Sequence, residues 1–335
     1  MLADRAGWAA PLVAAAGLAD EDIPAALQLA AQYGRQLPLP GGGQSAGRWA
    51  VLADVARQNL TVARVLEAHS DALAILAEAG QDAPDGTWGV FAAESAQHRL
   101  LAAPGPGPGQ VLLTGVKPWC SLAGQLDSAL VTAHAGQERQ LFRVSLRHPS
   151  VTVDPPGAWV ARGLRTVTSQ PVRFDATPAA AVGGPGWYLT RPGFAWGAIG
   201  VAACWLGGAR GLQDTLLRAS AGREGELAAL HAGIVDAALY AAEAALASAA
   251  CDLDAGRADG RDGDLLALRV RAVIAEAAEQ TIRQVGHALG PAPLAFDEEH
   301  ARRVADLELY VRQHHAERDL ARLGAAVIAR GQDAG

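Results

Sequence analysis

The chain has 335 residues, half of them hydrophobic and only 19% charged, with a net charge of −7. This length and apolar content exclude wholesale disorder and predict two or three packed units. The acidic balance and the lack of a basic stripe argue against nucleic-acid binding. Three well-separated cysteines without metal-binding spacing, Cys120, Cys204 and Cys251, predict a reduced, cytoplasmic protein.

The first 85 residues carry helical patterns. Apolar residues recur at spacings of three, four and seven through residues 49–78, which predicts a helix there. The Pro- and Gly-rich residues 37–45 predict a loop, and residues 82–86 predict a second break. Glu67 and Asp71 share one face of the predicted helix while His69 points elsewhere, and we interpret the two acids as part of a solvated face.

The pattern changes between residues 88 and 182. Short apolar, often β-branched segments at 111–113, 129–131, 141–144, 151–153 and 171–174 predict strands. The Pro-Gly alternation of residues 104–109 lacks the Lys-Ser/Thr ending of a phosphate loop, so it predicts a hairpin connection instead.

Helical patterns return at residues 194–220, 225–254, 264–289 and 298–330. Residues 192–209 carry no charge and are nearly long enough to span a membrane. This stretch is rich in Gly and Ala and has no second span beside it, so we predict a helix buried on all sides and no membrane contact. Helices, a small β unit and further helices, in that order, predict an α+β architecture.

This order resembles the acyl-CoA dehydrogenase family. Residues 114–121, with the sequence TGVKPWCS, are similar to the family's G-x-K-x-W-(I)-(T/S) segment, and residues 286–297 are similar to its V-Q-x-x-G-G-x-G-x-x-x-E segment. The resemblance implies an N-terminal helical domain over residues 1–87, a middle β-barrel-like domain over 88–187 and a C-terminal four-helix bundle over 188–335. It also implies an FAD cofactor.

The resemblance further implies which residues contact the flavin. Trp119 would lie against the flavin ring and Ser121 would bond to it. Arg223 aligns with an arginine that reaches the cofactor diphosphate of a neighbouring subunit, which implies a homodimer or homotetramer. Four residues stand where the family has other flavin-site residues: Ala93 in place of a Thr, His287 in place of a Gln, and His314 and His315 within the family's Y-E-G-T.

Asp297 falls on the family's catalytic carboxylate position. Dehydrogenation of an acyl thioester needs a base for the α-proton, and a carboxylate in a dry pocket can have its pKa raised for that work. The alternative is structural: Asp297, with Glu298 and Glu299, would open a helix as its N-cap and first-turn acids.

Three functional hypotheses follow. The first is an FAD-dependent α,β-dehydrogenase of an acyl substrate such as an acyl-CoA, with an unidentified electron acceptor. The second is a flavin-dependent monooxygenase on the same fold, with His287, His314 or His315 near the flavin. The third is a catalytically silent member that binds an acyl ligand or a partner. It is motivated by the missing G-S-D and by Ala93, which lacks the hydroxyl of the family's threonine. His315 and Asp319 alone share a helix face, so no metal site is predicted.

Overall fold

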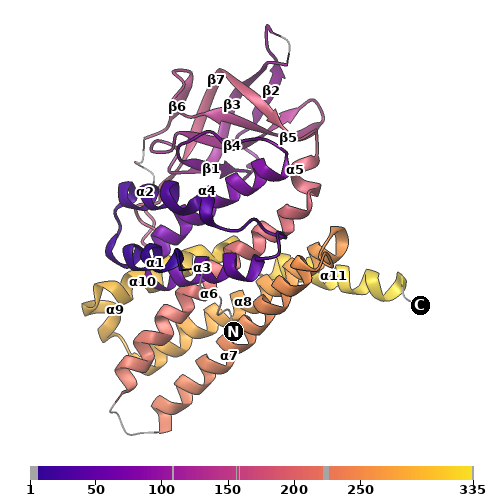
Figure 1. Cartoon of the computed structure of the whole chain (residues 1–335). Helices are drawn as coiled ribbons and strands as arrows, with labels where there is room; N and C mark the ends of the chain where they lie inside the picture. Colours follow the sequence, from indigo (N-terminus) through magenta and orange to yellow (C-terminus); the bar gives the residue numbers. More distant parts are fainter. Residues whose placement is uncertain (1–6, 108, 156, 158, 222–225, 334–335) are drawn as a thin grey trace.

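The computed structural model describes residues 7–107, 109–155, 157, 159–221 and 226–333. Strands gather at one end of the molecule and the long C-terminal helices at the other, with the N-terminal helices between them (Figure 1). In this arrangement α4 (Leu60–Glu78) packs against both β1 (Trp88–Phe91) and α6 (Pro192–Ser220). Helix α4 therefore connects the β unit with the C-terminal helices.

The described residues of the N-terminal part form the α-helices α1 (Ala9–Leu18), α2 (Ile23–Tyr33), α3 (Ser45–Gln58) and α4. The predicted continuous helix over residues 49–78 is wrong, because the chain breaks at Asn59. Its backbone is extended, and its side-chain oxygen accepts a hydrogen bond of 3.1 Å from the Val62 N–H. Asparagine is a preferred N-cap residue, which explains why α4 begins here without a proline or glycine.

The middle of the chain forms a closed five-stranded barrel, as the family resemblance implies. The barrel strands pair in the order β4-β2-β3-β7-β5, and β5 pairs back with β4. Outside the barrel, β1 joins β4 and β6 joins β7. The further strands are β2 (Leu100–Pro104), β3 (Val111–Ser121), β4 (Ser128–Ala135), β5 (Glu138–Ser145), β6 (Val151–Val153) and β7 (Ser169–Val182).

The predicted hairpin at residues 104–109 is confirmed by the antiparallel pairing of β2 with β3. The Gly105 N–H donates to the Gln110 carbonyl at 2.8 Å, which closes the turn. No phosphate loop is formed by the described residues of this turn.

The C-terminal part consists of α-helices that follow the barrel, with α6 at their centre. Residues 202–209 of α6 are all buried, which confirms for this half the prediction of a helix covered on every side. For residues 192–201 the prediction is wrong in part, because Pro192 and Phe194 are exposed. At its crossing with α3, a side chain at Gly207 would overlap the Ala53 carbonyl, so the close approach requires glycine. The others are α5 (Trp187–Thr190), α7 (Glu226–Asp254), α8 (Gly260–Leu289), α9 (Ala292–Phe296), α10 (Glu298–Tyr310) and α11 (Glu317–Asp333).

Helix α7 is the most exposed of the long apolar helices. Its residues 229–254 are long and apolar enough to cross a membrane by length and composition, and a third of the most apolar window is buried. Leu227 and Tyr240 are more than 70% exposed on it. This segment differs from residues 192–209, the stretch that the sequence singled out.

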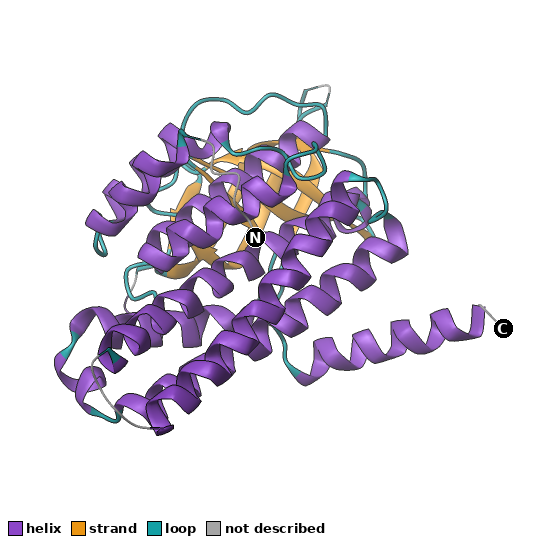
Figure 2. Ribbon diagram, turned by 60° about the horizontal axis from the view of Figure 1, so that its bottom comes forward, coloured by secondary structure: helices purple, strands orange, loops and turns teal. Residues whose placement is uncertain are grey.

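The predicted single helix over residues 298–330 is wrong. It is divided into α10 and α11 by residues 314–316, after a short 3-10 turn at Val311–Gln313. Ala316 adopts a left-handed backbone (φ 45°), and the Asp319 side chain accepts a hydrogen bond of 3.0 Å from the His315 N–H. Figure 2 shows α11 running away from the other helices after this break.

One buried histidine holds α4 to the barrel side of the molecule. The Nδ1 atom of His69 accepts a hydrogen bond of 3.1 Å from the Trp88 N–H at the start of β1. The ring packs so closely on Gly34 that a side chain there would overlap it. Burial, together with the nearby Arg35, lowers the pKa of His69 to about 4.

His69 should therefore make stability pH-dependent. In the unfolded chain it takes up a proton near pH 6.5, whereas in the folded protein it does so only near pH 4. The unfolded state binds more protons in this window, so the free energy of unfolding falls by up to about 3 kcal/mol as the pH is lowered through it. Urea denaturation between pH 7 and pH 4 should show a shallower pH slope for His69→Asn, which keeps the acceptor, than for the wild type.

Exposed His287 supplies the control for this measurement, because His287→Asn should keep the wild-type slope. Equal slopes for the wild type and His69→Asn would contradict the assignment.

Candidate functional site

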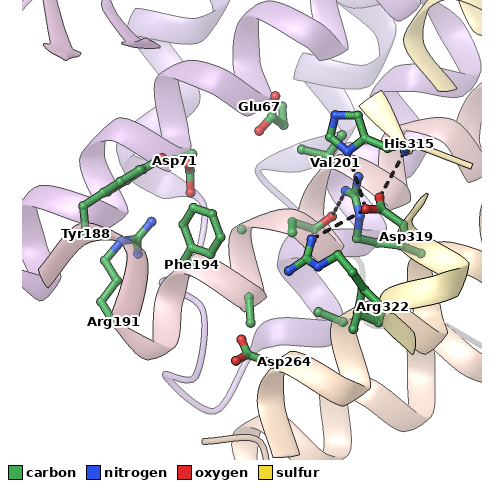
Figure 3. A pocket seen from close by; sticks show the side chains of 16 residues that line it. Glu67, Asp71, Tyr188, Arg191, Phe194, Val201, Asp264, His315, Asp319 and Arg322 are labelled. Carbon is green, nitrogen blue, oxygen red and sulfur yellow. Dashed lines mark hydrogen bonds and ion pairs between the residues drawn. The ribbon is translucent and has the colours of Figure 1, made fainter. Parts of the chain in front are cut away.

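A cavity of about 300 Å³ lies where α4, α6, α8 and the start of α11 meet (Figure 3). Its apolar lining includes Phe194, Val201 and Leu268. The polar side chains that line it are Glu67, Asp71, Tyr188, Arg191, Asp264, Arg271, His315, Asp319 and Arg322. A concave, largely apolar site with a few convergent polar groups is the usual form of a small-molecule site.

The two acids of α4 face this cavity, so their interpretation as part of a solvated face is wrong. Glu67 is 6% exposed and Asp71 is half-buried, because α6 covers this side of α4. One oxygen of Glu67 accepts hydrogen bonds from Arg64 at 2.8 Å and from the Tyr310 hydroxyl at 3.3 Å. Burial raises the pKa of Glu67, and the Arg64 guanidinium opposes this shift.

Arg64 connects this cavity with a smaller one beside the barrel. The smaller cavity, of about 20 Å³, is lined by Arg64, Ser121 and Val167 among others. Because Arg64 also binds Glu67, one ion pair spans the wall between the β unit and the main cavity. The sequence signal for it is an Arg three residues before a Glu within an otherwise apolar helical stretch.

Arg191 is a second buried charge in the cavity wall. It is 5% exposed and forms an ion pair of 2.6 Å with Glu78 of α4. Its guanidinium lies over the Tyr188 ring, 5.3 Å from the ring centre. Arg191 directly precedes the charge-free stretch of α6, and no pattern in the sequence singles it out as a site residue.

The break between α10 and α11 gives His315 its place in the cavity. Its side chain is 63% exposed, and its Nδ1 lies 3.5 Å from the Asp319 carboxylate (Figure 3). Burial alone would raise the pKa of Asp319, but the His315 N–H and the neighbouring histidines and Arg271 hold it below its usual value. An acid that is kept ionised beside a histidine can orient it for proton transfer.

His314 points to the other side of the break. It is 8% exposed and packs edge-on against Trp205 of α6, with ring centres 6.4 Å apart. Burial and nearby Arg271 lower its pKa. His314 is not among the residues that line the cavity, so only one of the two predicted histidines here reaches it.

Trp119 and Ser121 lie together on the barrel. Trp119 is 61% exposed and has a left-handed backbone (φ 59°) where the pairing of β3 with β7 shifts register. The following residue, Cys120, is fully buried, as strand alternation predicts. The Ser121 hydroxyl is 2.8 Å from that of Ser169 on β7. A non-glycine residue held at positive φ with its indole exposed is a feature that often marks a functional site.

The remaining predicted cofactor residues are dispersed or lie outside the described residues. Ala93 is exposed just beyond β1, next to Glu94, which forms an ion pair of 2.7 Å with buried Lys117. His287 is exposed near the end of α8, where it meets His231 edge-on at 6.3 Å. Arg223 lies outside the described residues.

Asp297 is exposed and does not line the cavity. Its side-chain oxygen accepts a hydrogen bond of 3.0 Å from the His300 N–H at the start of α10. The structure thus shows the N-cap that was the structural alternative. The catalytic role of Asp297 stays a prediction, and the buried carboxylates of the cavity come from other positions.

His315 and Asp319 are in contact, but not on one helix face as the spacing predicts, because His315 precedes the start of α11 at Glu317. Within the described part of the chain, no group of three or more His, Cys, Asp or Glu side chains could hold a metal ion.

Comparison with solved structures shows an acyl-CoA dehydrogenase-like fold. FMN-bound TdsC from Paenibacillus sp. A11-2 is 15% identical, with 96% of each chain covered and a TM-score of 0.81. Butyryl-CoA dehydrogenase from Megasphaera elsdenii is also 15% identical, with 97% of this chain and 99% of that chain covered and a TM-score of 0.81.

KijD3, solved with FMN and a dTDP-linked amino keto sugar, is 20% identical over 96% of this chain and 91% of that one, with a TM-score of 0.76. No protein-family model matches the sequence, and neither does any curated protein sequence.

The buried Arg64–Glu67 pair should be strongly coupled in stability. Replacing one partner leaves the other charge buried without compensation, which costs about 3–5 kcal/mol in the free energy of unfolding. Arg64→Met and Glu67→Leu should each show this loss, and the double variant should lose much less than the two losses together. Urea denaturation of the four proteins measures the coupling, and additive losses would contradict it.

Proposed function

We propose that the protein is a flavin-dependent monooxygenase whose substrate binds in the cavity between α4, α6, α8 and α11. The observation that carries the proposal is that His315, with its Asp319 partner, lines this cavity while Asp297 does not. A histidine was the residue expected for the monooxygenase, and Asp297 was the base expected for the dehydrogenase. TdsC is described as a dibenzothiophene monooxygenase, and this supports the choice of reaction.

The residues at the barrel fit a flavin ring. The exposed indole of Trp119 offers a stacking surface, and the hydroxyls of Ser121 and Ser169 offer hydrogen-bonding groups beside it. Arg223 remains the proposed contact for the cofactor phosphate of a neighbouring subunit in a homodimer or homotetramer. TdsC and KijD3 were solved with FMN, so we propose that the cofactor is either FMN or FAD.

A bound flavin would supply the two-electron redox chemistry, its reduced form reacting with O₂. The chain's own residues orient the substrate and handle protons. His315 can donate or accept a proton, and Asp319 fixes the orientation of its ring. The Arg64–Glu67–Tyr310 contacts hold the cavity wall in place between His315 and the barrel.

A dehydrogenase is the second candidate, and one observation favours it. Asp71 lines the cavity, and burial raises its pKa despite the opposing charges of Arg191 and Arg48. A carboxylate of this kind is what α-proton abstraction from an acyl substrate requires. In this case Asp71, rather than Asp297, would be the base.

Trp119→Ala should weaken flavin binding more than Trp159→Ala does. Aromatic stacking contributes about 1 kcal/mol beyond simple burial, which is about fivefold in Kd. Trp159 is the matched control, because it is half-buried and its indole N–H donates to the Arg165 carbonyl at 3.1 Å. FMN and FAD titrations followed by fluorescence measure the effect. Equal Kd values for the two variants would remove Trp119 from the site.

The reaction type can be decided with the flavin-loaded protein. With a flavin reductase, NADH and O₂, we expect an oxygenated product from indole, the smaller of the two compounds in the names of the TdsC structures. His315→Ala should reduce this rate by about 10²–10⁴-fold, as is usual for loss of a general acid or base. His287→Ala, outside the cavity, and Asp297→Asn should keep the wild-type rate.

The contrary result is that acyl-CoAs bleach the flavin under anaerobic conditions and that Asp71→Asn abolishes this bleaching. This result would establish the dehydrogenase. Bleaching abolished instead by Asp297→Asn would make Asp297 the base. Failure to bind either flavin would support the catalytically silent member.

A further inference from the structure

Asp71 differs from the other buried charged groups of the cavity in its partners. Glu67 is bound by Arg64 and Tyr310, and Arg191 by Glu78. Arg271 donates to two backbone carbonyls, at 2.8 Å each. Asp71 has no hydrogen bond or ion pair with any described residue, and Figure 3 draws no interaction to it.

The Asp71 carboxylate lies close to the backbone of α6 where this helix packs against α4. A Cβ at Gly197 of α6 would lie 2.8 Å from the Asp71 Oδ1, so only glycine leaves room for the carboxylate here. Asp71 and Arg191 also line an adjoining cavity of about 180 Å³. The carboxylate therefore stands where two cavities meet, against α6 at Gly197 and within the electrostatic field of the Arg191 and Arg48 guanidinium groups.

Two aromatic rings line the same cavity as this carboxylate. Phe194 and Tyr188 form an edge-to-face pair with ring centres 5.4 Å apart, and Figure 3 labels both together with Asp71. Phe194 is 38% exposed and lines the cavity. A carboxylate beside an aromatic face is a favourable environment for an organic ammonium group, which gains both an ion pair and a cation–π contact.

The arginines that line this cavity already have partners, and the exposed Arg322 pairs with Asp319 at 3.6 Å. Arg191 is already paired with Glu78 and covered by Tyr188. Arg271 is held by its two carbonyls and stacks on Trp205, 4.7 Å from the ring centre. An anionic ligand would have to displace these contacts, whereas a cation at Asp71 would displace none that the described residues make.

We propose that the substrate of this cavity is a small organic amine, whose ammonium group binds Asp71 and whose apolar body packs against Phe194, Val201 and Leu268. The inference rests on the proposed function only in treating the cavity as the substrate site. The carboxylate accepts hydrogen bonds from the ammonium group, and no covalent step is involved. A cavity of about 300 Å³ suits a ligand with one ring and a short side chain.

Matched probes test the charge preference independently of shape. The binding of three scaffolds is measured by calorimetric titration: phenyl, cyclohexyl and indolyl. Each scaffold carries an ethyl chain that ends in an amine, an alcohol or a carboxylate. For at least one scaffold the amine should bind at least tenfold more tightly than its alcohol and carboxylate counterparts. Asp71→Asn keeps the size and removes the charge, and it should abolish this preference.

Asp264→Asn is the matched control. Asp264 lines the same cavity but is exposed on α8, so its loss should change the preference less than twofold. Circular dichroism establishes that each variant is folded.

Flavin titrations of the same samples separate the two proposals. The amine assignment alone is overturned if flavin still binds but no scaffold shows a preference for the amine. It is also overturned if flavin binds and the amine preference persists in Asp71→Asn. A preference for the alcohols would point to a neutral substrate and also overturns it.

Discussion

The ion pair between Arg64 and Glu67 is the contact on which the candidate site depends. Both side chains belong to α4, and the Tyr310 hydroxyl joins them from the end of α10. Desolvating two charges is expensive, so such a pair persists only where its geometry and its further hydrogen bonds compensate. The Arg64–Glu67 pair lies between the barrel and the long helices. Glu67 lines the main cavity and Arg64 lines the smaller cavity beside Ser121.

Much of the fold could be predicted because it follows from local patterns. The strands around residues 111–113 and 141–144 and the hairpin between β2 and β3 carry β-branched residues and Pro-Gly turns. The burial of α6 follows from its lack of charge. Trp119 could be recognised from the segment TGVKPWCS, which resembles a flavin-contacting segment, but its left-handed backbone at the register shift of β3 could not.

The breaks at Asn59 and at residues 314–316 could not be found in the same way. Neither contains a proline or glycine, and each depends on a side chain that bonds to backbone: Asn59 to Val62, and Asp319 to His315. The second break decides the site, because it places His315 in the cavity and His314 against Trp205. Helical periodicity alone would put both histidines on one continuous helix.

The acids of the site illustrate a different limit of sequence reasoning. Glu67 and Asp71 share a face as predicted. Whether that face is exposed to solvent or buried is decided by α6, which is distant in sequence. Asp297 aligned with a catalytic position, yet its local contacts are those of an N-cap. The fold is thus shared with acyl-CoA dehydrogenase-like proteins, while the role of each charged group around the cavity has to be argued from its own contacts.

The most direct test of this account is a crystal structure of the protein with bound flavin. We expect electron density for the isoalloxazine ring against the Trp119 indole, with the Ser121 hydroxyl within hydrogen-bonding distance and the cavity of Asp71 and His315 open toward the ring. Density for the ring elsewhere, or a cavity separated from the ring by protein, would contradict the proposed site.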